Sequence, residues 1–366
     1  MAEITLKGLA HSYLPDPQSP EDYAIREMDH VWHQGGAFAL LGPSGCGKST
    51  LLNIISGLLE PSGGEVLFDG EKVNSLSPEA RNIAQVFQFP VVYDTMTVYD
   101  NLAFPLRNVG TAAGRVHERV MEVAEVLELT PQLKRKAKNL TADEKQKVSM
   151  GRGLVREDVS AILFDEPLTV IDPQLKWKLR RKLKEIHRRF NITMVYVTHD
   201  QLEASTFADK IAVMYEGQVV QFGTPRELFE APNHTFVGYF IGSPGMNFLP
   251  VAMEGGRVMC GEAPLVVGEA FEKALQATSS ENVKLGIRPE FVEAHATEVK
   301  GATEAEVVDI QDLGTYAILS LRLGGILLKA RLDEDEPRPR VRAWLRFPVG
   351  RLGLYVDEFR VEVPHE

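Results

Sequence analysis

The sequence has only two cysteines, Cys46 and Cys260, and it lacks any long apolar run. Two distant cysteines form no disulfide framework and have no metal-ligand spacing, a usage typical of a reducing compartment. No segment approaches the roughly 20 apolar residues that a membrane-spanning helix needs. The first residues lack a basic segment followed by an apolar one, so we predict no signal peptide. Any role at a membrane must therefore depend on partner proteins.

Positive charge is also in short supply. The 366 residues include 40 Lys and Arg against 51 Asp and Glu, which gives a formal net charge of -11. Bulk binding to nucleic acid needs basic surface that displaces counterions, and adhesion to anionic lipid needs the same sign of charge. The composition argues against both, while a hydrophobic content of 44% is ordinary for a globular protein of two or three compact domains.

A glycine-rich loop between a short apolar strand, Ala37–Leu41, and a helix is the first clear motif. The loop reads Gly42-Pro43-Ser44-Gly45-Cys46-Gly47-Lys48-Ser49. This spacing fits the G-x-x-x-x-G-K-[ST] pattern, in which glycines let backbone N–H groups turn toward a phosphate at a helix N-terminus. We expect Lys48 to contact the β- and γ-phosphates of a nucleotide and the Ser49 hydroxyl to ligate Mg²⁺. An ordinary glycine turn is the alternative, and Cys46 is expected to be only a small loop residue.

Two carboxylates follow another apolar strand. Ala161–Phe164 leads directly into Asp165 and Glu166. An isolated Asp-Glu pair is usually a solvated turn or a helix cap, but here a phosphate loop lies upstream. We predict that Asp165 holds the Mg²⁺ hydration shell and that Glu166 polarises the attacking water, because phosphoryl transfer needs positioning and charge neutralisation.

A histidine ends a further buried strand. Thr193–Thr198 precedes His199, and parallel strands gather active groups at their carboxyl ends. His199 could therefore reach the γ-phosphate, although a structural role is the common one for a single strand-end histidine. Gln88 follows a short apolar strand and is weak evidence by itself.

The pattern of predicted secondary structure changes near Gly242. Residues Val98 to Arg156 have mostly helical periodicity, whereas short strands and frequent turns follow Gly245. We predict an α/β nucleotide-binding domain over 1–242, with a helical subdomain at about 89–158. A small β-barrel or sandwich is expected over 243–366.

These motifs, in this order and over the whole chain, resemble the nucleotide-binding subunits of ABC transporters. The resemblance implies a P-loop NTPase fold with an antiparallel β-subdomain and a helical subdomain, followed by an OB-like all-β domain. Leu285–Glu290 resembles the "GIRPE" element of importer ATPases of the sugar and polyol group, which supports uptake over export. ATP and Mg²⁺ are the implied ligands.

The resemblance also assigns roles to matching positions. Gly42–Ser49, with Thr50 after it, is identified as the Walker A loop, and Asp165 and Glu166 as the Walker B aspartate and the catalytic glutamate. His199 is similar to the switch histidine, and Asp172 to the loop that crosses the dimer interface. The remaining matches are Tyr13, as the aromatic that stacks on adenine, and Gln88, as the residue that senses nucleotide and joins Ser49 and Asp165 around Mg²⁺. Tyr23 competes with Tyr13, which could also be a plain packing residue.

The family signature is altered in this chain. The usual L-S-G-G-Q is replaced by Leu140-Thr141-Ala142-Asp143-Glu144. Thr141 and Glu144 form a predicted capping box, so a helix is still expected to begin here. Asp143 would place negative charge close to the γ-phosphate held by the other subunit, and this would weaken that site unless Asp143 points away. Such asymmetry predicts a pair of non-identical ATPase subunits, in which Thr141 contacts the partner's nucleotide.

Three segments refine the resemblance. Val86–Asp94, Thr141–Arg156 and Gly242–Asn247 are similar to an ATPase of the glycerol importer group described for rhizobia. That implies two permeases, a periplasmic solute-binding protein and a peripheral position at the cytoplasmic face of the bacterial inner membrane. A sugar, sugar-alcohol or glycerol-phosphate importer is the alternative. A soluble ABC-type ATPase in DNA maintenance is disfavoured, since sustained coiled-coil heptads are missing. The C-terminal domain could in addition bind a regulatory metabolite or protein.

Overall fold

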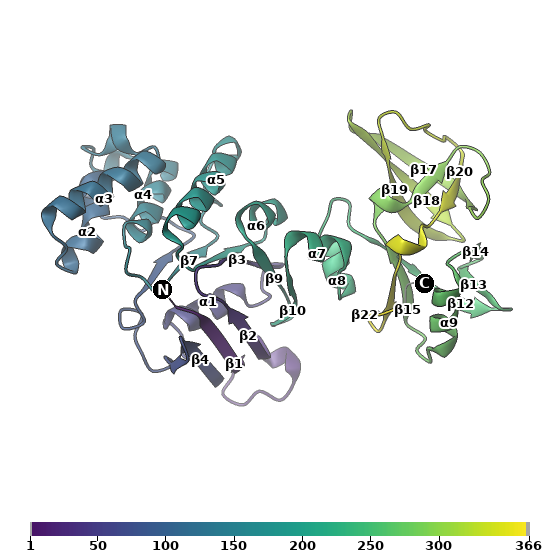
Figure 1. The fold of residues 1–366 in the computed structure, drawn as a ribbon, viewed down its shortest axis with the longest axis horizontal. Helices are drawn as coiled ribbons and strands as arrows, with labels where there is room; N and C mark the ends of the chain where they lie inside the picture. Colours follow the sequence, from purple (N-terminus) through teal and green to yellow (C-terminus); the bar gives the residue numbers. More distant parts are fainter. Residues whose placement is uncertain (1, 364–366) are drawn as a thin grey trace. The chain divides into compact units, whose positions relative to one another are not determined.

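The computed structural model describes residues 2–363 (Figure 1). These residues form two compact units that divide after Pro225. Each unit has its own hydrophobic core. None of the helices in residues 2–363 is long and apolar enough to cross a bilayer. The predicted combination of an α/β nucleotide-binding fold with a C-terminal all-β domain is confirmed.

A six-stranded sheet forms the centre of the N-terminal unit. Its strands run in the order β10-β9-β3-β8-β7-β6, and all neighbours are parallel except the β9–β10 pair. Strands β3 and β8 are buried along their whole length, which explains their continuous apolar sequence. The bounds are β3 Ala37–Leu41, β6 Ile83–Val86, β7 Ala161–Asp165, β8 Met194–Thr198, β9 Lys210–Tyr215 and β10 Gln218–Gly223.

A second, antiparallel sheet packs against the same core. Its order is β2-β1-β4-β5, and the apolar side chains of β1 share one cluster with those of α1 and β3. The bounds are β1 Ile4–His11, β2 Ile25–Trp32, β4 Gly63–Phe68 and β5 Glu71–Lys72.

Three helices form the expected helical subdomain, in which α2, α3 and α4 contact one another (Figure 1). Thr97 caps α2 and Thr141 caps α4. On α3, the apolar residues Val116, Val120 and Val123 are buried, in line with the helical periodicity of this region. The helices of this unit are α1 Lys48–Ser56, α2 Val98–Asn108, α3 Ala113–Val126, α4 Ala142–Leu154, α5 Pro173–Phe190 and α6 Gln201–Phe207.

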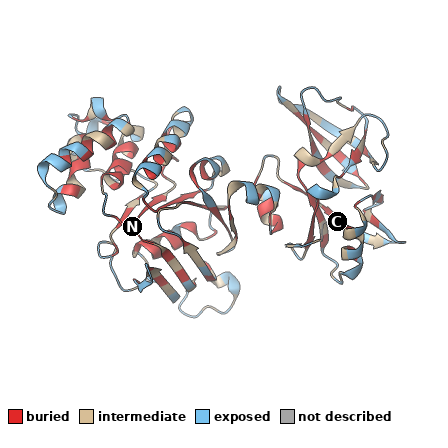
Figure 2. Cartoon of the chain, viewed as in Figure 1, coloured by how far each residue is buried: buried red, intermediate tan, exposed pale blue. Residues whose placement is uncertain are grey.

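The C-terminal unit is built from three antiparallel sheets of order β11-β15-β21-β22, β12-β13-β14 and β16-β20-β17-β18-β19. Buried positions alternate with exposed ones along many of its strands (Figure 2). Its elements are α7 Pro225–Glu230, α8 Thr235–Phe240, β11 Asn247–Pro250, β12 Ala252–Glu254, β13 Arg257–Cys260, β14 Ala263–Leu265, α9 Glu269–Ala277, β15 Val283–Ile287, β16 Glu293–His295, β17 Thr303–Asp312, β18 Tyr316–Leu323, β19 Ile326–Asp333, β20 Arg342–Arg346, β21 Gly353–Val356 and β22 Phe359–Val361.

Helices α7 and α8 belong to the C-terminal unit because Arg288 binds them. The Arg288 guanidinium is 1% exposed and donates hydrogen bonds to the carbonyl oxygens of Phe229 and Gly238 at 2.9 Å, and to that of Ile241. Burial lowers the pKa of Arg288 to about 10. The compact units thus divide at Pro225, whereas the composition change that motivated a boundary at residue 242 lies after α8. Residue 242 therefore stays a sequence-based prediction for the end of the ATPase domain.

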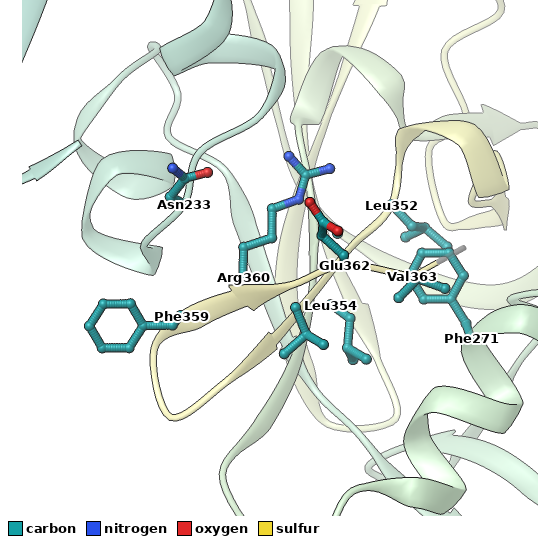
Figure 3. Close-up of a pocket in the computed structure, with 10 residues that line it drawn as sticks. Asn233, Phe271, Leu352, Leu354, Phe359, Arg360, Glu362 and Val363 are labelled. Carbon is teal, nitrogen blue, oxygen red and sulfur yellow. The ribbon is translucent and has the colours of Figure 1, made fainter. Parts of the chain in front are cut away.

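The C-terminal unit contains a cavity of about 900 Å³ along strands β21 and β22 (Figure 3). Phe271, Leu352 and Val363 gather on one side of it, whereas Asn233 and Arg360 lie on another. None of the residues singled out in the sequence as nucleotide or metal ligands lines this cavity.

Candidate functional site

The glycine-rich loop occupies the predicted place between β3 and α1. Gly45 and Gly47 have φ angles of +82° and +100°, a left-handed region that side chains avoid. A Cβ atom at Gly47 would lie 2.4 Å from the Ala24 carbonyl oxygen, whereas one at Gly45 would meet nothing within 4 Å. The loop conformation therefore needs glycine at both positions, and at Gly47 it also needs the space.

Lys48 is buried at the start of α1. Its Nζ donates to the carbonyl oxygens of Gly42 at 2.9 Å and Pro43 at 2.8 Å, within the loop itself. Its third contact is the Cys46 Sγ at 3.9 Å. A buried ammonium held by these neutral groups can exchange them for phosphate oxygens, which are stronger acceptors. Burial raises the pKa of the adjacent Cys46 thiol, and Lys48 only partly opposes this shift. A raised pKa fits Cys46 as a small packing residue of the loop.

The Ser49 hydroxyl and the Asp165 carboxylate meet beside the loop. Ser49 Oγ donates to Asp165 Oδ1 at 3.3 Å. Burial raises the pKa of Asp165, and the charge of Glu166 raises it further, while Ser49 and Lys48 act in the opposite direction. In residues 2–363 no group of three or more His, Cys, Asp or Glu is placed to hold a metal by itself. Two protein oxygens completed by phosphate oxygens fit Mg²⁺, which is commonly bound this way.

Glu166 and His199 are brought together by the pairing of β7 with β8. Asp165 pairs with Val197 across these parallel strands, and the Glu166 N–H donates to the Val197 carbonyl oxygen at 3.0 Å. His199 Nδ1 then lies 3.1 Å from Glu166 Oε1. Glu166 has a φ angle of +44°, uncommon for a residue with a side chain. Strain of this kind concentrates at functional sites, and here it directs a carboxylate to the end of the sheet.

The other residues predicted to contact the nucleotide or the metal lie around the phosphate loop and the Glu166–His199 pair. Tyr13 is 66% exposed, and its hydroxyl lies 3.1 Å from Thr50 Oγ1, next to the phosphate loop. Tyr13 and its competitor Tyr23 both line a cavity of about 550 Å³. Gln88 follows the end of β6, which pairs with β7, but within residues 2–363 no hydrogen bond joins it to Ser49 or Asp165. Its role as a metal ligand stays a prediction.

The altered signature begins helix α4 as predicted. Thr141 Oγ1 accepts a hydrogen bond from the Glu144 N–H at 3.2 Å, and a Glu144 carboxylate oxygen accepts one from the Thr141 N–H at 2.9 Å. Asp143 extends along the helix, with Oδ2 3.8 Å from Lys147 Nζ and Oδ1 buried without a partner. Burial raises the pKa of Asp143, partly offset by Lys147, and the carboxylate of Asp172 adds to the increase. Asp172 itself caps α5, where it accepts from the Gln174 N–H at 2.8 Å.

Two buried polar residues that the sequence analysis missed position these segments. Gln146 of α4 donates to the carbonyl oxygens of Phe87 at 3.1 Å and Pro167 at 2.9 Å, which links the segments after β6 and β7. Glu203 of α6 accepts from Tyr196 and Thr198 at 3.0 Å and pairs with Lys176 of α5 at 3.3 Å. In the sequence, the only sign of such a role is a polar residue at an inward-facing position of a helix. That pattern does not identify the hydrogen-bond partners of Gln146 and Glu203.

Comparisons with known proteins found matches for both parts of the chain. A family model for ABC transporters matches residues 25–169, and one for the MalK OB fold domain matches residues 242–292. An sn-glycerol-3-phosphate import ATP-binding protein of Cupriavidus necator is 39% identical over 356 residues, which is 95% of this chain and 94% of that protein. A multiple sugar-binding transport ATP-binding protein of Streptococcus mutans is 38% identical over 98% of both chains.

Solved structures match the nucleotide-binding part. A dimeric ATP-binding cassette in a post-hydrolysis state, bound to ADP and Pi, is 28% identical with a TM-score of 0.54, covering 60% of this chain and 98% of that one. A component of an ABC transporter complex from Clostridium perfringens is 26% identical with a TM-score of 0.56, covering 62% of this chain and 90% of that one.

The loop geometry predicts unequal effects of alanine at its two left-handed glycines. Gly47→Ala should lower the free energy of unfolding by more than about 3 kcal/mol, since strain is joined by a backbone clash. Gly45→Ala should cost only about 1 kcal/mol, because it adds strain alone. Urea unfolding followed by circular dichroism measures both values. Equal losses in the two variants would contradict the loop geometry.

Proposed function

Because the chain belongs to the ATP-binding proteins of ABC transporters, we propose that it hydrolyses ATP at the Gly42–Ser49 loop to drive uptake of a small polyol. The observation that carries this is the meeting of the phosphate loop, the Ser49–Asp165 pair and the Glu166–His199 pair at one edge of the central sheet. We place the protein peripherally at the cytoplasmic face of the bacterial inner membrane, bound through two permease subunits.

In the proposed reaction Lys48 leaves the loop carbonyls and binds the β- and γ-phosphates, while loop N–H groups bind the remaining oxygens. Ser49, Asp165 and, after a local movement, Gln88 would hold Mg²⁺, which neutralises phosphate charge when bound. Glu166 accepts a proton from the attacking water. His199 orients Glu166 and reaches the γ-phosphate. Tyr13 stacks on the adenine.

The energy of ATP binding is used to close two ATPase subunits onto each other. Asp172 and the Thr141 end of α4 would face the second subunit, as their family counterparts do. Gln88 adjoins an exposed apolar segment in which Phe89 is 69% and Val91 50% exposed. We propose that this segment grips a cytoplasmic helix of the permease, because exposed apolar clusters mark contact surfaces.

Glu166→Gln tests the chemical assignment. Its ATPase rate should fall by at least about 100-fold, the usual contribution of a general base, while ATP binding persists and a closed, ATP-bound form accumulates. Phosphate release and gel filtration with Mg-ATP measure the two effects. Glu125→Gln on the exposed face of α3 is the matched control and should leave the rate unchanged. Normal hydrolysis by Glu166→Gln would show that the assignment is wrong.

We further propose that the second ATPase is a non-identical chain with an unmodified signature. The support comes from Asp143, which lies at the end of α4 that is proposed to face the partner's phosphate. Its carboxylate is half-buried, and one of the two carboxylate oxygens has no hydrogen-bond partner. Asp143→Asn should then raise the ATPase rate of this chain alone severalfold, since repulsion of the phosphate is removed. Asp335→Asn removes the same charge from an exposed loop and should have no effect. An unchanged rate in Asp143→Asn, with no stimulation by a second ATPase, would contradict this proposal.

The transported solute is proposed to be glycerol, on the resemblance of Val86–Asp94, Thr141–Arg156 and Gly242–Asn247 to glycerol importer ATPases. The second candidate is sn-glycerol 3-phosphate, which the name of the Cupriavidus relative favours. Uptake of labelled glycerol and of labelled glycerol 3-phosphate should be compared in cells carrying the wild-type or the Lys48→Ala chain. We expect the Lys48→Ala cells to lose uptake of glycerol and to keep uptake of glycerol 3-phosphate. Selective loss of glycerol 3-phosphate uptake would favour the second candidate, and loss of neither would contradict both.

A further inference from the structure

A basic cavity lies between helices α5 and α6, outside the proposed nucleotide site. The two helices contact each other in the N-terminal unit (Figure 1). The cavity has a volume of about 380 Å³. It is lined by Trp177, Arg180, Arg181, Lys184, Glu185, Arg188 and Thr206. Four cations and one carboxylate give the lining a formal charge of +3, although the whole chain carries -11. A concave surface of one sign attracts small ions of the other.

Arg180 is the unusual member of this lining. The residue is 8% exposed, and its Nε atom is buried without a hydrogen-bond partner. Among residues 2–363, no carboxylate oxygen lies within 4 Å of its guanidinium. A buried cation is costly unless it is paired and hydrogen-bonded. In Arg288, the comparable buried arginine of the C-terminal unit, every guanidinium nitrogen donates to at least one carbonyl oxygen. Arg180 thus has the unmet binding capacity of a ligand site.

The other cations differ in how far they are neutralised. Arg181 pairs with Glu185 at 3.3 Å and Lys184 with Asp209 at 3.8 Å. Arg188 is exposed, and no carboxylate oxygen of the described chain lies within 4 Å of it. Arg180, Lys184 and Arg188 recur every four residues along α5, so they follow one face of the helix. A planar guanidinium is well suited to oxyanions, which it can bind through two parallel hydrogen bonds.

Trp177 adds an apolar surface to this face. Its side chain begins one turn before Arg180 and is 52% exposed. We propose that the cavity binds a phosphate-bearing anion, with the phosphate on Arg180 and Arg188 and the adjoining carbon groups against Trp177. The phosphate could belong to a free metabolite or to a lipid headgroup, and the chemistry of recognition is the same for both.

A ligand bound in this cavity would affect the proposed nucleotide site through helices α5 and α6. Asp172 caps the start of α5, and Asp200, next to His199, caps α6. Thr206 of α6 also lines the cavity, so a ligand that contacts Thr206 as well as Arg180 would fix the spacing of these starts and so change the rate of ATP turnover. This consequence depends on the proposed function, whereas binding itself does not.

Binding can be tested on the full chain with inorganic phosphate as probe and Mg-ADP saturating the phosphate loop. Titration calorimetry and tryptophan fluorescence should show saturable binding at millimolar phosphate. Arg180→Gln should weaken it at least tenfold, and Arg180→Lys should weaken it less because the charge is kept. Lys178→Gln removes an exposed charge of the same helix outside the cavity, and it should bind as the wild type does. Trp177→Phe should remove the fluorescence change but keep the calorimetric signal.

Sedimentation with vesicles of phosphatidylcholine, with or without phosphatidic acid, distinguishes a free phosphate-bearing ligand from a lipid headgroup. Arg180-dependent binding of phosphate supports a free ligand. Arg180-dependent binding to phosphatidic acid vesicles, without phosphate binding, supports a lipid headgroup. If neither is seen, or if Lys178→Gln weakens binding as much as Arg180→Gln does, the proposal is wrong. Loss of Mg-ADP binding or of ATPase activity in the wild type would instead contradict the proposed function. Thermal unfolding of Arg180→Gln, expected at the wild-type midpoint or above it, shows whether that variant is folded.

Discussion

The parallel pairing of β8 with β3 on one side and β7 on the other is the constraint on which the candidate site depends. Leu41 pairs with Thr198, and Asp165 pairs with Val197. These registers place the phosphate loop, the two carboxylates and His199 at the same edge of the sheet. A slip of one residue in β7 would turn each side chain of this strand to the other face of the sheet and separate Asp165 and Glu166 from Ser49 and His199. The strands are buried on both faces, so packing holds the register firmly.

Buried positive charge is treated in different ways across the molecule. Lys48 is held by two loop carbonyls, and Arg288 by carbonyls of α7, α8 and the turn after them. The Arg288 bonds link a helical segment to a β-domain and are structural. The Lys48 bonds close a small loop on itself, and a phosphate could replace them. Arg180 has no such acceptors in the described chain. A buried cationic side chain therefore acts as a structural clamp in Arg288, as a proposed substrate ligand in Lys48 and as an open site in Arg180, depending on which oxygens surround it.

Local patterns carried most of the successful sequence predictions. The phosphate loop, the apolar strands and the capping box at Thr141 and Glu144 each depend on a few neighbouring residues, and each is present. The proximity of Glu166 to His199 followed from the rule that parallel strands collect functional groups at their carboxyl ends. The direction of Asp143 along α4 toward Lys147 could not be read from the pattern, because it depends on burial by neighbouring segments.

Contacts between distant segments were the part that sequence reasoning missed. Gln146 joins segments near residues 87 and 167, and Arg288 assigns helices α7 and α8 to the C-terminal unit. Nothing near Arg180 in the sequence indicates that its partners are missing, since the basic helix reads as an ordinary solvated face. Such features depend on which side chains the fold brings around a residue, and this is determined by long-range packing.

The central claim is that one ATP lies between the phosphate loop and the Glu166–His199 pair. A crystal structure of the full chain with Mg²⁺ and a non-hydrolysable ATP analogue tests it most directly. We expect Lys48 Nζ to leave the carbonyl oxygens of Gly42 and Pro43 and to contact the β- and γ-phosphates, with Glu166 beside the terminal phosphorus. A nucleotide bound elsewhere, or one bound here with Lys48 still on the loop carbonyls, would contradict the proposed site.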